Sequence, residues 1–206
     1  MKKVLMVSAA MAVCAAGSAQ ALELKPYAGV GVGSMIMNTS VTGPASSFAQ
    51  QKYLPGFFLR AGVDLNKNFA VEFRTGLSTS ASKFWPANTA QMPANFTWGN
   101  KVRNFYSGFV KAQTRIDEGR IYLLGGLSTV DIESTITSSV NGSMQTTNNT
   151  AYSIGVGFDV ALNKESDVGI EYLIYQMDRP MNSGLPAGNQ TTYTLQGLNL
   201  LYTHHY

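Results

Sequence analysis

The sequence of 206 residues predicts an all-β fold, an eight-stranded antiparallel up-and-down β-barrel, from three observations. Apolar and polar or small residues alternate with a period of two in successive segments, which is typical of strands with two different faces. The connections between these segments alternate between short turns and long polar stretches. Charged residues make up 13% of the chain, against about a quarter in ordinary soluble domains.

The clearest alternation lies in residues 57–77, where two runs flank a short Asn-Lys-Asn turn. If Leu65 pairs with Phe69 across the turn, every apolar residue falls on one face and every charged residue on the other. In that register Arg60 lies opposite Arg74. The segment therefore predicts a β-hairpin with one apolar and one charged face.

Six further segments show strand-like patterns, at residues 27–37, 102–112, 120–129, 151–162, 167–177 and 193–206. Short turns are expected near 66–68, 113–119 and 163–166, and long polar loops at 38–53, 78–101, 130–149 and 178–192. Strands of about 9–11 residues cross a bilayer when tilted. Short turns at one end and long loops at the other are typical of outer-membrane barrels.

The polar face decides between a membrane barrel and a soluble one. A soluble barrel in the periplasm points its apolar side chains inward and carries Lys and Glu outside. Here the polar face is rich in Gly and carries only isolated charges. We therefore predict a transmembrane barrel whose apolar residues contact outer-membrane lipid. The sheet must close, because lipid cannot satisfy backbone polar groups.

The N-terminus has the pattern of a secretory signal peptide. Lys2 and Lys3 precede an apolar, Ala-rich run at residues 4–16, and the small-x-small pattern ends at Ala21. The run is too short for a spanning helix, which needs about 20 residues, and this disfavours a retained N-terminal anchor. We predict a signal peptide at 1–21, cleaved after Ala21, and an outer-membrane β-barrel domain at 22–206.

The charge and the cysteine content of the mature chain argue against nucleic-acid binding, disulfide bonds and cysteine-based metal sites. Cleavage leaves 185 residues and lowers the formal charge from +3 to +1, so we expect no nucleic-acid partner. The only cysteine, Cys14, lies in the leader, which excludes disulfides and cysteine-based metal sites from the mature protein.

These segments together resemble the small outer-membrane β-barrel superfamily, including porin-like, opacity-type and outer-membrane-protein-A-type barrels. The resemblance rests on the leader, YAGVGVG at 27–33, GVDL and FAVEF at 62–65 and 69–73, and LNLLYTHHY at 198–206. It implies a location in the cell outer membrane and a last strand recognised by the outer-membrane assembly machinery. Four residues match that terminal pattern: Leu198, Leu200, Tyr202 and Tyr206. His204 departs from it, and an ordinary edge strand is the alternative.

Four charged residues are predicted to point into the lumen: Arg60, Glu72, Arg74 and Glu171. The interior of an eight-stranded barrel is just wide enough for side chains to fill. We therefore expect an ion-pair network that closes the lumen, with a selectivity filter as the alternative.

No catalytic site, cofactor or metal site is predicted, and we expect that the protein is not an enzyme. The histidines of the mature chain, His204 and His205, lie at the periplasmic end, away from the loops where hydrolases and acyltransferases of this compartment act. A serine nucleophile therefore lacks its base. Adjacent strand residues also point to opposite faces and cannot readily share one metal ion.

The loop at residues 78–101 contains four aromatic residues, Phe84, Trp85, Phe96 and Trp98. Exposed loop aromatics mark recognition surfaces, although a place in the aromatic girdle at the membrane interface, or packing over the barrel mouth, is an equal alternative. We predict a monomeric outer-membrane protein with a structural or surface-interaction role of the adhesion or colonisation type. Its long loops would contact an extracellular or host surface ligand. The alternative function is a narrow porin-like channel for small solutes.

Overall fold

A computed structural model describes residues 24–44, 47–117, 119–139 and 142–206. The predicted signal peptide lies outside these residues. The described strands are β1 (Lys25–Thr42), β2 (Ser47–Asp64), β3 (Phe69–Ser78), β4 (Ala81–Trp85), β5 (Phe96–Ile116), β6 (Gly119–Ser138), β7 (Gly142–Ala161), β8 (Ser166–Pro180) and β9 (Gln190–His205). One 3-10 helix, η1 (Thr89–Gln91), precedes β5, and no helix among the described residues is long and apolar enough to cross a membrane.

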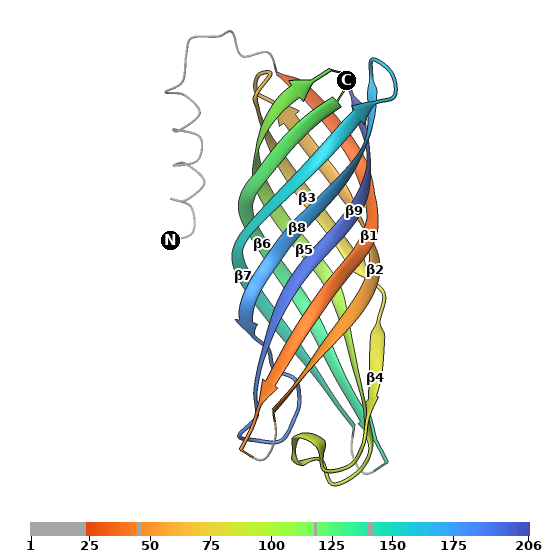
Figure 1. The fold of residues 1–206 in the computed structure, drawn as a ribbon, viewed down its shortest axis with the longest axis vertical. Helices are drawn as coiled ribbons and strands as arrows, with labels where there is room; N and C mark the ends of the chain where they lie inside the picture. The colour runs from red at the N-terminus through yellow and green to blue at the C-terminus, as the bar shows by residue number, and fades with distance from the viewer. Residues whose placement is uncertain (1–23, 45–46, 118, 140–141) are drawn as a thin grey trace.

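The strands form a closed antiparallel ring (Figure 1). Each strand pairs with the next one in sequence, except that β3 pairs with β5 and not with β4, and β9 returns to β1. The short β4 follows β3 after a two-residue break and continues the pairing with β5. Together β3 and β4 act as one interrupted strand, so the predicted eight-stranded barrel is confirmed.

The hairpin between β2 and β3 has the predicted register. Arg60 pairs with Arg74, and the backbone N–H of Leu65 donates to the carbonyl of Phe69 at 2.8 Å. The side chain of Asn66 closes the turn, because its Oδ1 accepts from the backbone N–H groups of Asn68 and Phe69. The Asn at the start of this turn therefore fixes which face each strand residue takes.

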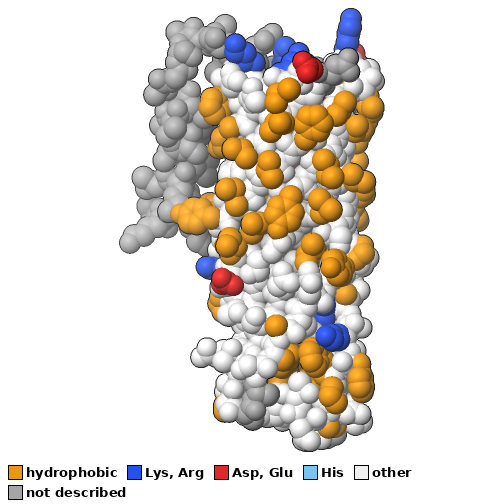
Figure 2. Space-filling model, viewed as in Figure 1, with side chains coloured by type: hydrophobic (Ala, Val, Ile, Leu, Met, Phe, Trp, Pro, Cys, Tyr) orange, Lys and Arg blue, Asp and Glu red, His pale blue; other side chains and the backbone are white. Residues whose placement is uncertain are grey.

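Large apolar side chains surround the half of the barrel next to the short turns (Figure 2). Phe57, Leu59 and Phe73 are each about half exposed on the outside, while the alternating charged residues are buried inside. We call this outward zone the apolar belt; its members include Val30, Leu59, Phe73, Leu123, Val156, Ile170 and Leu200. Its composition is that of a lipid-facing surface.

The prediction of four long polar loops is wrong. The strands continue through most of these segments: β5, β6 and β7 each have 20 or 21 residues, about twice the length needed to cross a bilayer. The true connections at this end are 43–46, 86–95, 139–141 and 181–189. Many outward residues here are Thr, Ser, Asn or Gln, which can face water from a strand as well as from a loop.

The interior of this extracellular half is an apolar core. Its members include Met37, Leu54, Phe58, Trp98, Phe105, Ile132, Ile136, Tyr175 and Leu195. The ring of Phe105 contacts those of Phe58 and Tyr175, with centroids 6.1 and 5.1 Å apart. The barrel thus has a charged interior near the periplasmic end and an apolar interior above it.

Candidate functional site: the closed lumen and the extracellular rim

The structure brings together all four lumen residues that the sequence singled out. Arg74 binds Glu171 through two parallel hydrogen bonds, from Nη1 to Oε1 at 2.6 Å and from Nη2 to Oε2 at 2.7 Å. Its Nε also donates to Glu72, and Nη2 of Arg60 lies 3.0 Å from Oε2 of Glu72. The four side chains are buried, so each charge is compensated inside the barrel.

Two tyrosines complete this layer, and the sequence analysis did not identify them. Tyr27 donates its hydroxyl hydrogen to Glu72 at 2.8 Å, and Tyr122 donates to Glu171 at 3.1 Å. Each ring lies against a glycine of the neighbouring strand. A Cβ at Gly62 would lie 2.4 Å from the ring of Tyr27, and a Cβ at Gly157 would lie 2.3 Å from the ring of Tyr122. A lumen-facing glycine opposite a tyrosine is the sequence signal that could have found them.

Aromatic rings also cover the guanidinium of Arg74. Its Cζ lies 5.2 Å from the ring of Phe58 and 5.1 Å from that of Phe109. The charged layer therefore passes directly into the apolar core, and side chains fill the lumen across the junction. We call the layer of Arg60, Glu72, Arg74 and Glu171 the charged plug.

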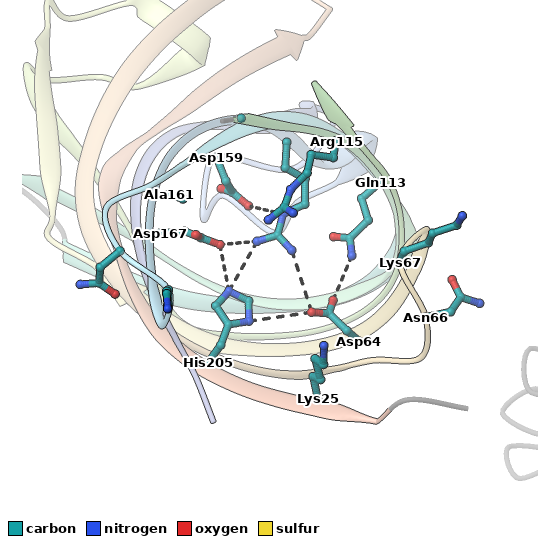
Figure 3. Close-up of a pocket in the computed structure, with 14 residues that line it drawn as sticks. Lys25, Asp64, Asn66, Lys67, Gln113, Arg115, Asp159, Ala161, Asp167 and His205 are labelled. Carbon is teal, nitrogen blue, oxygen red and sulfur yellow. Dashed lines mark hydrogen bonds and ion pairs between the residues drawn. The ribbon is translucent and has the colours of Figure 1, made fainter. Parts of the chain in front are cut away.

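A second group of charges lies between the charged plug and the periplasm. Lys111 is 3.2 Å from Asp159 and lies over the ring of Tyr122. Asp64, Arg120, Asp167 and His205 line a cavity of about 480 Å³ at the mouth (Figure 3). His205 points into it, with Nε2 2.9 Å from Oδ2 of Asp167.

Two of the four predicted recognition aromatics are buried, so the expectation that they lie on an exposed loop is wrong. Phe96 and Trp98 belong to β5 and point into the apolar core, where Nε1 of Trp98 donates to Oγ of Ser134 at 2.7 Å. The reason is a β-bulge between Val102 and Asn104, which reverses the inward parity of β5. Residues 96, 98, 100 and 102 face inward before it, and 105, 107, 109 and 111 after it.

The other two aromatics lie on β4. Trp85 is half-buried, and its ring centroid lies 4.5 Å from that of Phe48. Phe84 points outward and is 62% exposed, although it pairs with Thr97 in the extracellular extension of the barrel, well beyond the apolar belt. An exposed phenylalanine in contact with water is the feature of this rim that best fits a recognition surface.

A buried lysine lies next to these aromatics. Lys52 is in the extracellular extension of β2, and its Nζ donates to the carbonyl of Trp98 and to Oδ1 of Asn100. No carboxylate pairs with it among the described residues. Burial and, to a smaller extent, the nearby ammonium of Lys83 together lower the pKa of Lys52 to about 7.

The last strand presents its alternating residues to the lipid side. Leu198, Leu200 and Tyr202 are exposed within the apolar belt, and the backbone N–H of Tyr206 donates to the carbonyl of Pro26 at 3.0 Å. His204 and His205 point to opposite faces, since His204 packs against Tyr206 while His205 lines the mouth. Among the described residues, no group of three or more His, Cys, Asp or Glu side chains could hold a metal ion.

A family model described as an outer membrane protein β-barrel domain matches residues 5–202. No curated protein matches the chain. Among solved structures, the outer membrane protein OprG of Pseudomonas aeruginosa has a TM-score of 0.55 at 10% identity, with 88% of this chain and 96% of that chain covered. At that identity, the likeness concerns the fold alone.

Two further structures resemble the chain less closely. The N-terminal β-barrel domain of Pseudomonas aeruginosa OprF has a TM-score of 0.46 at 12% identity and covers 84% of this chain and 97% of its own. The attachment invasion locus protein Ail of Yersinia pestis, crystallised with the heparin analogue sucrose octasulfate, has a TM-score of 0.42 at 12% identity. It covers 85% of this chain and 98% of its own.

Proposed function

Because the chain belongs to the outer membrane protein β-barrel family and is therefore an outer-membrane protein, we propose that it acts at the cell surface through its extracellular half. In this proposal the lumen is closed to solutes, and the protein has no catalytic role. The observation that carries the proposal is the continuous packing of the interior, from the charged plug into the apolar core.

The charged plug is the main obstacle to transport. The carboxylates of Glu72 and Glu171 are each engaged by a guanidinium group and by a tyrosine hydroxyl, so both anionic groups of the plug already have partners. The narrow porin-like channel is the second candidate, and the cavity at the periplasmic mouth favours it. That cavity is lined only by residues on the periplasmic side of the charged plug.

The extracellular half supports a surface role in a different form from the one that the sequence suggested. Paired strands that surround an apolar core hold this surface in place, whereas long loops would leave it mobile. The exposed ring of Phe84 is the proposed anchor for an extracellular or host surface ligand. An aromatic ring on a rigid strand binds at low cost in conformational entropy.

Strand β9 carries a separate proposal about assembly. Leu198, Leu200 and Tyr202 form an outward apolar stripe, and Tyr206 follows it at the end of the strand. This arrangement supports recognition of β9 by the outer-membrane assembly machinery during insertion.

Two measurements test the surface role. Purified protein in planar bilayers should give no stable single-channel conductance, and a reproducible conductance would favour the channel. Bacteria that display Phe84→Ala at the wild-type level should adhere less to an epithelial cell monolayer. Met144→Ala is a matched control, because Met144 is equally exposed on β7 and should leave adhesion unchanged if Phe84 is the anchor.

A further inference from the structure

The cavity at the periplasmic mouth has the composition of a binding site that is independent of the proposed surface function. Its volume of about 480 Å³ falls within the range of small-molecule sites, about 300–1,000 Å³. Its lining comes from β1, β2, β5, β6, β7, β8, β9 and the turns between them (Figure 3). The closed ring holds these side chains around one space.

The three carboxylates of the cavity are already engaged with inner cations. Arg120 donates to Asp167 and lies 3.8 Å from Asp159 and 3.9 Å from Asp64. His205 contacts Asp64 and Asp167 as well, and Lys111 pairs with Asp159. The three carboxylates therefore pair with the cations of the inner wall, and among the described residues they leave some cations at the rim of the cavity without a partner carboxylate.

Arg115 is one of the cavity-lining cations that these carboxylates leave uncompensated, together with Lys67 and Lys164 among the described residues. It lies directly across from Arg120 in the pairing of β5 with β6, so two guanidinium groups face the same cavity. Like charges opposite each other on a sheet are unfavourable unless an anion lies between or beside them. Within the described residues no carboxylate pairs with Arg115, and an anionic ligand group would supply the missing partner.

The inner wall also carries two buried acceptors that lack donors. Oε1 of Gln113 and Oδ1 of Asp159 have no hydrogen-bond partner, although both side chains line the cavity and are more than nine-tenths buried. Gln113 is two residues before Arg115 on the same face of β5, and Asp159 pairs with Arg120 on the other side. A buried acceptor without a donor is unfavourable, and a ligand N–H group would supply the missing hydrogen bond.

We propose that this cavity binds a small zwitterion of the amino-acid type from the periplasm, with its carboxylate on Arg115 and its ammonium directed to Gln113 and Asp159. Arg115, Arg120 and Asp159 lie side by side in one row across the adjacent strands β5, β6 and β7. Gln113 lies two residues from Arg115 along β5. The outer members of this row are two strand spacings apart, about 10 Å, and the arginine side chain spans much of that distance. A ligand with both charges on one carbon fits the remaining gap.

The test compares three ligands of similar size on the wild-type protein in detergent micelles at low salt. Alanine carries both groups, propionate lacks the ammonium, and ethylamine lacks the carboxylate. The side-chain N–H signals of Gln113 and Arg115 report binding by NMR. We expect saturable shifts with alanine and at least tenfold weaker binding of the other two, as expected when one charged hydrogen-bonding group is lost. The absence of a saturable shift with alanine, or equal binding of propionate, overturns the proposal.

A substitution locates the site. Arg115→Gln should weaken alanine binding about tenfold, because it removes the charge that meets the carboxylate. Lys83→Gln removes one positive charge at the opposite end of the barrel and should leave the affinity unchanged. Heat-modifiable migration in detergent gels verifies that both variants are folded. Equal losses in the two variants would mean that the ligand responds only to net charge, which contradicts the assigned site.

Discussion

Strand β6 passes through both halves of the barrel and shows how their chemistry differs. Its odd-numbered residues face outward from Ile121 to Thr137. They are apolar at Leu123 and Leu127, within the apolar belt, and polar from Thr129 onward. On the inward side, the charged surroundings of Tyr122 are replaced by apolar contacts at Ile132 and Ile136. The same strand geometry therefore presents apolar side chains to lipid in one half of the barrel and polar side chains to water in the other half.

The difference shows what stabilises each half. In water, the extracellular half gains free energy by burying apolar side chains in its interior, as a soluble barrel does. In lipid, an apolar interior has no such advantage, so the membrane half depends on hydrogen bonds and ion pairs inside a closed sheet. The charged plug therefore stabilises the interior of the half that lies in lipid, and the apolar core stabilises the interior of the half that lies in water.

The largest effect is expected from breaking the charged plug. Glu171→Leu leaves the guanidinium of Arg74 with Glu72 as its only carboxylate, in a fully buried position. Loss of one partner from a buried ion pair costs about 3–5 kcal/mol. Reversible unfolding in denaturant, with the protein in lipid bilayers, measures the free energy of unfolding directly.

A double substitution is the matched control. Arg74→Met with Glu171→Leu removes both charges and leaves Arg60 paired with Glu72 at 3.0 Å. Replacement of a whole buried pair by apolar residues is often close to neutral, so the double variant should be more stable than Glu171→Leu alone. If it is equally unstable, packing and not charge compensation accounts for the role of the plug.

An intermediate effect is expected from lysine placed on the two outward surfaces of β6. Leu123→Lys puts a charge in the apolar belt and should cost about 2–4 kcal/mol. Thr137→Lys places the same side chain on the same face of the strand, beyond the belt, and should change the stability by less than about 0.5 kcal/mol. Equal costs at the two positions would show that the boundary between lipid and water lies elsewhere.

The sequence predicts the membrane half well, because charged and apolar residues alternate there without interruption. The pairing of Leu65 with Phe69 fixes the hairpin register, and this places Arg60 and Arg74 inside. The extracellular half lacks this contrast. Between residues 130 and 149, inward Ile132 and Ile136 are separated by inward Ser134, and many outward positions are small polar residues that also occur in loops.

The positions of the site residues depend on details of register that a periodic pattern does not contain. The bulge at Val102–Asn104 moves the inward face of β5 by one residue, and this buries Trp98. Tyr27 and Tyr122 enter the lumen because glycines on neighbouring strands leave room for their rings. The charge pattern of the sequence predicts which residues form the charged plug. It does not predict which aromatic rings surround them, because that depends on the residues of the neighbouring strands.

The last prediction is a pH dependence of stability, and it concerns Lys52, which is buried in the half that otherwise contains an apolar core. The pKa of Lys52 is lowered to about 7 in the folded protein, mainly by burial, against about 10.4 in an unfolded chain. Between these values the unfolded state binds more protons, so the free energy of unfolding should rise with pH. The slope should be at most about 1.4 kcal/mol per pH unit, and it should vanish below about pH 7, where both states are protonated.

Lys52→Met isolates this contribution, because methionine keeps the packing of the aliphatic chain but cannot titrate. The difference in unfolding free energy between wild type and variant should therefore shrink as the pH rises from about 7 to about 10. Other titrating groups cancel in this difference, since both proteins contain them. A difference that does not depend on pH would mean that Lys52 remains charged in the folded state. The hydrogen bonds from its Nζ to Trp98 and Asn100 would then compensate for its burial, and a charge would be as acceptable in the extracellular interior as in the charged plug.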